Sequence, residues 1–443
     1  MKKCAIVLLC FAMVLGGLSG CGTKATGQND GEKVKNASFE TLAAGFGKVD
    51  VTPTLGVHLG SYGNAATRTT TGVKDNFYAL TTALTDPEGN TLILIVTDLS
   101  WGYYTWSAKV REAVTEKYGI PGDHVMLGGT HNHNGPVWEG DVAGYAINKE
   151  YLEGWLKGVL ESVDQAMADR SPVTSMEVGR TETEGLGFVR RYWREDGNFY
   201  ATSGGSSYYV QSNSPIVRYE SEGDEEVQLV KISREEGKDI LIGQWQNHGC
   251  HIGDTTIAAT DWIGPMREKV EEELDVHYLY MQGAAGNMST ISKIASDYPV
   301  KKTADQVGEE VADVIVAACK SGSTFSQVKV GNIVTKQEEF TENKTSYGSN
   351  SWTGEMNTLG IGELAIVTFP VEVFAESGIE LKEQSPYAMT LLMGYTNGIH
   401  GYIPTREAYE NGGYEADSRG WADTAERFVD TYLKSLNELY AKR

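Results

Sequence analysis

Basic residues are scarce in this sequence. Its 443 residues include 38 lysines and arginines against 60 aspartates and glutamates, which gives a formal net charge of −22. A surface of this sign repels phosphate backbones, so nucleic acid is not an expected partner. The apolar fraction of 40% and the charged fraction of 22% are those of an ordinary globular protein with a large core.

Long apolar runs are equally rare, and the clearest lies at residues 5–20, after Lys2 and Lys3. It is short for a membrane-spanning helix, which needs about 20 apolar residues, and is typical of an export signal. The run ends in LSGC, which looks like the lipobox of a bacterial lipoprotein. We therefore expect removal of residues 1–20 and lipidation of Cys21; an ordinary signal peptide is the alternative.

The predicted organisation follows from this processing. Residues 1–20 form the signal peptide, residues 21–41 the lipidated cysteine and a polar, flexible tether, and residues 42–443 one large domain. The expected location is outside the cytoplasm, with a lipid anchor in a bacterial membrane.

Cysteine is also rare, with five residues, of which Cys21, Cys250 and Cys319 remain after processing. Lipidation of the first leaves two, which is too few for a disulfide framework. A Cys250–Cys319 bridge stays open at this point. The position of Cys319 on the apolar side of a helical run favours a buried thiol instead.

Helical and extended patterns alternate along the rest of the chain. Helical periodicity marks residues 105–119, 148–167, 304–320 and 421–443, with Asn148 as an N-cap and Gly119 just beyond a helix end. Short apolar runs lie at 91–98, 124–129, 239–246, 277–282, 364–369 and 388–394. This order predicts an α/β fold, a mixed and mainly buried sheet flanked by helices. No internal repeat is visible in the sequence.

Uncommon polar segments follow five of these runs: HNHNGP, NHGCHIGD, GAAGNMS, PVEVF and YTNGIHGYIPT. Ligands of open α/β sheets bind beyond the carboxyl ends of the strands. The five segments are therefore expected to converge on one active site, which argues for a single catalytic domain.

Four of the eight histidines fall in two of these segments, His131 with His133 and His248 with His251. Imidazole suits zinc, and a catalytic zinc takes three protein ligands and leaves a position open. On an extended backbone, His131 and His133 point to the same face. A metal site and hydrogen-bonded structural histidines both remain open from these residues alone.

Three other residue types carry weaker signals. Ser289 follows a glycine-rich loop and suits a nucleophile, a hydrogen-bond donor or a capping residue, but no GxSxG elbow surrounds it. Glu372 stands at the start of a predicted helix, where an acidic side chain often only compensates the helix dipole. Tyr402 and Tyr414 are two of 23 tyrosines.

Several segments taken together resemble the neutral/alkaline (non-lysosomal) ceramidases. They are GKVDVTPTLGVHLGSYG, DNFYALTTAL, GGTHNHNGP, WQNHGCHIG, QGAAGNMS, FPVEVF and GYIPTREAYENGGYE, in the family's order from about Ala44 onward. The resemblance implies a zinc-dependent amidase. Its substrate is ceramide or a ceramide-like lipid, cleaved to a sphingoid base and a fatty acid by metal-activated water.

The resemblance also implies roles for individual residues. The implied Zn²⁺ ligands are His131, His248, Glu372 and Tyr402. His133, Ser289, Tyr414 and Arg190, or its neighbour Arg191, are implied to act on the substrate as catalytic residues.

Departures from the family pattern keep other functions in view. Asn287 and Thr290 replace an aspartate and a proline, the arginine segment reads GFVRRYW, and we expect no additional immunoglobulin-like domain after the last helix. The alternatives are hydrolysis of another N-acyl amine or an ester, a non-catalytic lipid- or glycan-binding lipoprotein, and a metal-independent serine hydrolase acting through Ser289.

Overall fold

The computed structural model describes residues 38–64, 67–137, 149–201, 212–294, 296–297, 300–343, 351–416 and 421–443. The predicted signal peptide, Cys21 and the Asn148 cap lie outside these residues. Within them, no helix combines the length and apolar character needed to cross a membrane.

A single arrangement of strands and helices occurs three times along the described chain. Three strands of a main sheet pair antiparallel in chain order, a helix crosses over, a fourth strand pairs parallel to the third, and another helix follows, with short elements inserted between them. The first repeat comprises β1 (Ala43–Asp50), β3 (Tyr78–Thr85), β4 (Thr91–Thr97), α1 (Tyr104–Tyr118), β5 (Val125–Gly129) and α2 (Lys149–Ala168). This structural repetition has no counterpart in the residue pattern, in which no internal repeat is visible.

The other two repeats have the same order. The second comprises β6 (Ser171–Glu182), β11 (Glu226–Arg234), β12 (Ile240–Trp245), α3 (Ile263–Leu274), β14 (His277–Gln282) and α4 (Ala304–Ser321). The third comprises β17 (Ile333–Glu342), β18 (Trp352–Ile361), β19 (Leu364–Thr368), α5 (Ala375–Gln384), β21 (Met389–Met393) and α7 (Thr424–Tyr440).

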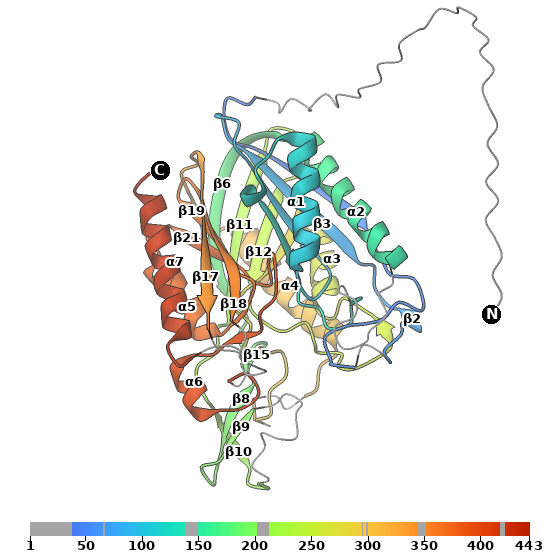
Figure 1. Cartoon of the computed structure of the whole chain (residues 1–443), viewed down its shortest axis with the longest axis vertical. Helices are drawn as coiled ribbons and strands as arrows, with labels where there is room; N and C mark the ends of the chain where they lie inside the picture. Colours follow the sequence, from blue (N-terminus) through green and yellow to red (C-terminus); the bar gives the residue numbers. More distant parts are fainter. Residues whose placement is uncertain are drawn as a thin grey trace, which may run out of the picture.

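The repeats assemble into two main sheets. Pairing of β1 with β6 joins the first two repeats into a nine-stranded sheet that also contains β16 (Phe325–Gln327), and the third repeat forms a four-stranded sheet. Short elements make up the rest: β2 (Gly72–Val73), β7 (Phe188–Val189), β8 (Arg191–Arg194), β9 (Phe199–Ala201), β10 (Ile216–Tyr219), β13 (Ile257–Ala258), β15 (Met288–Ser289), β20 (Glu372–Val373), β22 (Tyr402–Ile403), α6 (Arg406–Asn411) and a 3₁₀ turn at Gly122–His124. Figure 1 shows α1 and α2 on one flank, α5 and α7 on the opposite flank, and β8, β9 and β10 at one end.

Burial explains why these segments form strands. The parallel strands β4, β5, β12, β14, β19 and β21 are buried almost throughout, as continuous apolar runs require. Leucine, isoleucine, valine and methionine from all three repeats form the core between the sheets. Each fully buried side chain of this kind contributes about 1.5–3 kcal/mol relative to exposure. The predicted mixed, mainly buried sheet flanked by helices is confirmed.

Two glycines set how closely helices approach their neighbours. A Cβ atom at Gly47 in β1 would lie 2.0 Å from the carbonyl oxygen of Ser162 in α2. A Cβ atom at Gly308 in α4 would lie 2.2 Å from the carbonyl oxygen of Trp262. Only glycine permits such contacts. Cys319, near the end of α4, is a half-buried free thiol, as is Cys250, so the open disulfide question resolves to two free thiols.

The carboxyl ends of the parallel strands meet at one place. Gly394, after β21, donates its N–H to the Gln282 carbonyl at the end of β14 (2.9 Å), and Asn397 donates to Leu127 in β5 (2.9 Å). Thr396 forms a bridge with Gly128. Segments distant in sequence are thereby fixed side by side, as the position of the polar segments predicted.

Candidate metal centre

Two histidines lie at this junction with the same hydrogen-bonding arrangement. The Nδ1 atom of His131 lies 3.2 Å from the Ser100 carbonyl, and Nδ1 of His248 lies 3.1 Å from the Met288 carbonyl. A carbonyl only accepts, so each Nδ1 carries the proton and each Nε2 keeps a free lone pair. This arrangement orients histidines that bind metals.

Both free nitrogens face the Glu372 carboxylate. Its Oε2 lies 3.4 Å from Nε2 of His131 and 3.2 Å from Nε2 of His248. Neither Oε2 nor the His248 Nε2 has a hydrogen-bond partner in the described structure, although both are buried. Ligands held about 2.0–2.1 Å from a tetrahedral zinc lie about 3.3 Å from one another. The donor set and its spacing therefore fit a bound divalent cation.

His133 belongs to the same cluster. Its Nε2 lies 3.1 Å from Nε2 of His131, and the ring nitrogens of His131, His133 and His248 all lie within 4.8 Å of one another. These three histidines could hold a metal ion. His133 is half-buried, and the edge of the Tyr62 ring packs against it at a centroid distance of 5.2 Å.

The two neighbouring histidines converge for a different reason from the expected one. His131 is not extended, because its φ is +58°, in the left-handed region that non-glycine residues rarely adopt. Hydrogen bonds hold the turn: His131 N–H donates to Leu99, and His133 N–H donates to Gly249. A strained backbone at a polar centre is typical of functional sites.

Burial keeps the cluster neutral. It lowers the pKa of His131 to about 3, an effect that the Ser100 hydrogen bond opposes and the Arg190 charge reinforces. The pKa values of His133 and His248 also fall well below the usual value, mainly through burial. Neutral imidazole is the form that binds metal.

Glu372 and Tyr402 are brought together by a short parallel pair. They are register partners in β20 and β22, so their side chains leave adjacent strands at the same level. Glu372 precedes α5 rather than beginning it, which corrects its expected helical position; the acidic residue in the first turn is Glu376. Burial and the Glu372 charge raise the pKa of Tyr402 well above its ordinary value.

The two adjacent arginines have different surroundings. The Arg190 guanidinium donates to the Tyr402 hydroxyl (3.1 Å), the Gly286 carbonyl (2.9 Å) and Glu415 (2.9 Å). Arg191 is fully buried and donates to Glu220, Glu415 and the Ala408 and Gly412 carbonyls. Arg190 therefore reaches the centre, whereas Arg191 ties β8 to the α6 segment.

Tyr414 packs against Tyr402. Their rings pack edge to face at 5.5 Å, and burial raises the pKa of Tyr414. Ser289 directly follows Met288, whose carbonyl orients His248, but its hydroxyl accepts from the Ile291 N–H (3.1 Å). That bond is typical of a local turn.

Asn287 shows why an amide suits this position. Its Nδ2 donates to both carboxylate oxygens of Glu376 (3.1 and 3.0 Å), and its Oδ1 accepts from the Ala375 N–H. An aspartate here would place two carboxylates in contact. The other histidine of the second pair, His251, has both ring nitrogens occupied, by Thr290 and the Lys302 carbonyl, and is structural.

Comparison with known proteins agrees with this geometry. Residues 42–294 match the family model described as neutral/alkaline non-lysosomal ceramidase, N-terminal. The chain belongs to this family.

Two solved ceramidase structures share the fold. Neutral ceramidase from Pseudomonas aeruginosa matches with a TM-score of 0.72 at 15% identity, over 91% of this chain and 75% of that one. A ceramidase complexed with C2 matches with a TM-score of 0.72 at 14% identity, over 91% and 76%. The family resemblance predicted from sequence is confirmed.

Sequence reasoning missed two aromatic residues of this ceramidase-family site. Tyr395 stacks on the His131 ring with a centroid distance of 3.9 Å and an interplanar angle of 19°, and Trp101 lies 4.7 Å from the same ring. Trp101 lies in none of the polar segments, and Tyr395 begins the segment YTNGIHGYIPT, in which Tyr402 was the tyrosine singled out. The only available signal was position, since both follow buried strands.

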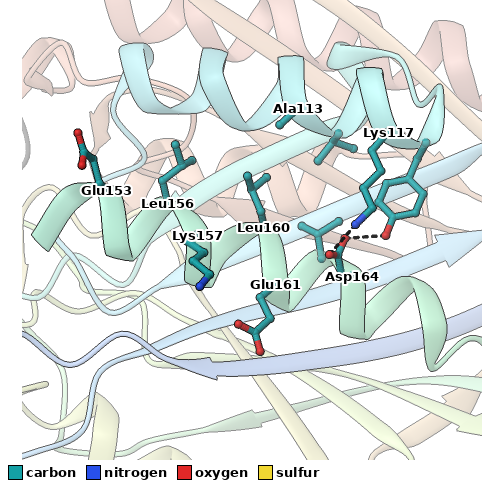
Figure 2. Close-up of a pocket in the computed structure, with 11 residues that line it drawn as sticks. Ala113, Lys117, Glu153, Leu156, Lys157, Leu160, Glu161 and Asp164 are labelled. Carbon is teal, nitrogen blue, oxygen red and sulfur yellow. Dashed lines mark hydrogen bonds and ion pairs between the residues drawn. The ribbon is translucent and has the colours of Figure 1, made fainter. Parts of the chain in front are cut away.

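The surface grooves lie elsewhere. A groove of about 540 Å³ separates α1 from α2 and is lined by Leu156, Leu160 and the Lys117–Asp164 ion pair (Figure 2). Equivalent grooves lie between α3 and α4 and between α5 and α7. Because each repeat has one beside its helix pair, they reflect helix packing, and none contains a predicted site residue.

Proposed function

We propose that this ceramidase-family chain is a zinc-dependent hydrolase that cleaves the N-acyl bond of ceramide or a ceramide-like lipid. The observation that carries the proposal is the convergence of two oriented imidazoles and a carboxylate at separations suited to one ion. In the family context, the proposed ligands are His131, His248, Glu372 and Tyr402. When bound, zinc would polarise the amide carbonyl and activate water.

The surrounding residues would then act on the substrate. His133 lies beside the proposed ligands, with its Nε2 facing His131 and its Nδ1 buried and unpartnered, so its imidazole can pass a proton to the departing amine. Tyr414 packs against Tyr402, and its phenol O–H suits a donor to developing negative charge. Arg190 donates a hydrogen bond to the Tyr402 hydroxyl and holds it in place. Ser289 directly follows Met288, whose carbonyl orients His248.

We further propose that residues 1–20 are removed and that a lipid on Cys21 tethers the enzyme to a bacterial membrane, outside the cytoplasm. This arrangement would keep the site near lipid substrates. The support is the sequence of the leader, together with the family's lipid chemistry.

The test is zinc analysis combined with a hydrolysis assay over a panel of N-acyl lipids that includes ceramide. We expect about one zinc per chain and activity that a chelator abolishes. His131→Ala should lose both zinc and activity, whereas His133→Ala should keep zinc and lose rate. His277→Gln is the control, because this imidazole lies at the opposite end of β14 and stacks on Phe46. Hydrolysis by a zinc-free protein would refute the proposal.

A further inference from the structure

Tyr395 occupies in the third repeat the place that His131 occupies in the first. Each is the second residue after the fourth strand of its repeat, β21 or β5. Their φ angles are +56° and +58°, so both backbones take the same left-handed turn. The turn that directs His131 into the centre therefore directs Tyr395 towards it from the adjacent repeat.

The Tyr395 ring is held rigidly in this position. One face stacks on His131, and Trp101 packs against both rings, at 5.7 Å from Tyr395. The Tyr395 carbonyl accepts from Gly102 N–H (2.8 Å), and the preceding Gly394 N–H is bonded to Gln282. These contacts fix the direction of the phenol.

The hydroxyl of this fixed phenol has no partner in the described structure. Tyr395 is 1% exposed, and its oxygen makes no hydrogen bond. Leaving a buried polar group unpaired is costly and calls for a missing partner. The neighbouring buried Tyr280 differs, since its hydroxyl bonds the Trp245 carbonyl and the Gln282 side chain.

The stacked ring holds the phenol beside the proposed metal ligands. It packs on the His131 ring, whose Nε2 lies 3.4 Å from the Glu372 carboxylate. A buried, unpartnered phenol O–H in this position suits a carbonyl or carboxylate oxygen brought by a ligand.

We propose that Tyr395 is a further catalytic residue, whose hydroxyl donates a hydrogen bond to the acyl oxygen of the bound N-acyl substrate and to the carboxylate of the released fatty acid. Its ring additionally positions the His131 imidazole by stacking. This inference rests on the proposed function and adds a substrate contact to the residues singled out from the sequence.

The test compares Tyr395→Phe with the unchanged protein, because phenylalanine keeps the stacked ring and removes only the hydroxyl. Octanoate serves as the carboxylate probe, and its binding to the purified, zinc-loaded full-length protein is measured by calorimetry. We expect octanoate to bind about 10-fold more weakly and kcat/KM for an N-acyl lipid to fall about 100-fold. Zinc content should be unchanged.

Tyr387→Phe is the matched control, because Tyr387 is also buried with an unpartnered hydroxyl but packs against Tyr440 in the third repeat. It should leave octanoate binding and kcat/KM unchanged. Wild-type octanoate affinity and kcat/KM in Tyr395→Phe would overturn the inference, as would failure of the unchanged protein to bind octanoate. Failure of the proposed function is seen separately, as absence of zinc and of hydrolysis in the unchanged protein.

Discussion

The turns after β5 and β21 have the same backbone geometry but carry different chemistry. In the first repeat the turn presents the His131 imidazole, and in the third it presents the Tyr395 phenol, with φ angles of +58° and +56°. Glu372 and His248 instead follow the third strands of their repeats, β19 and β12. The repeated fold thus supplies equivalent positions around one centre, and under the proposed function the side chain at each position would decide whether it binds a metal or a substrate.

The largest change in this comparison should follow from Glu372→Gln. Zinc affinity should fall more than about 100-fold, because a neutral amide replaces the central carboxylate that faces both histidines. Titration against a competing chelator measures the loss. Glu376→Gln removes a nearby carboxylate on α5 and should keep the unchanged protein's affinity. Equal affinities for both variants would remove Glu372 from the ligand set.

A smaller effect, on the stability of the fold, is expected where the third repeat contacts the first. The Asn397 side chain accepts from the Leu127 N–H (3.0 Å), and Asn397 itself has a φ of +58°. Asn397→Ala should lower the free energy of unfolding by about 2 kcal/mol, because a buried N–H loses its partner. Denaturant unfolding measures the change. Asn397→Gly can adopt the positive φ without strain but also loses the side-chain hydrogen bond to Leu127. A glycine variant as stable as the original would therefore show that this hydrogen bond is unimportant.

The smallest effect is expected on zinc release, when the Tyr395 ring that stacks on His131 is removed. Tyr395→Leu removes the aromatic face that packs on His131 and should speed zinc release about 10-fold, since groups that orient metal ligands typically contribute 10- to 100-fold in affinity. Transfer of zinc to a fluorescent chelator gives the rate. Tyr395→Phe keeps the ring and should release zinc at the original rate; identical rates in all three proteins would argue against positioning by the ring.

Much of the fold could be predicted because its parallel strands are buried on both faces and read as continuous apolar runs. The polar segments after those runs correctly indicated where a site would form. The threefold repetition could not be predicted, because equivalent strands share burial and order but not side chains. The sequence pattern predicted that His131 and His133 converge, because an extended backbone would point both to one face. They do converge, but a left-handed turn at His131 brings them together.

Other parts of the site depend on contacts between distant segments. No sequence pattern distinguishes Arg190 from Arg191, because the difference between them is spatial: the Arg190 guanidinium faces Tyr402, and that of Arg191 faces the buried Glu220. Tyr395 begins one of the polar segments, but nothing in that segment marked it as a site residue among 23 tyrosines, because its role comes from stacking on a residue far earlier in the chain. The predicted roles of Ser289 and Tyr414 stay predictions.

The short pairing of β20 with β22 has a consequence for how the protein matures. It brings Tyr402 beside Glu372. The proposed ligands then extend along the chain from His131 to Tyr402, and each of the three repeats contributes at least one of them. A growing chain has no complete set of ligands until the third repeat has docked on the first two. Metal uptake would therefore mark the end of folding rather than guide its beginning, and zinc content would report the fraction of molecules that are correctly assembled.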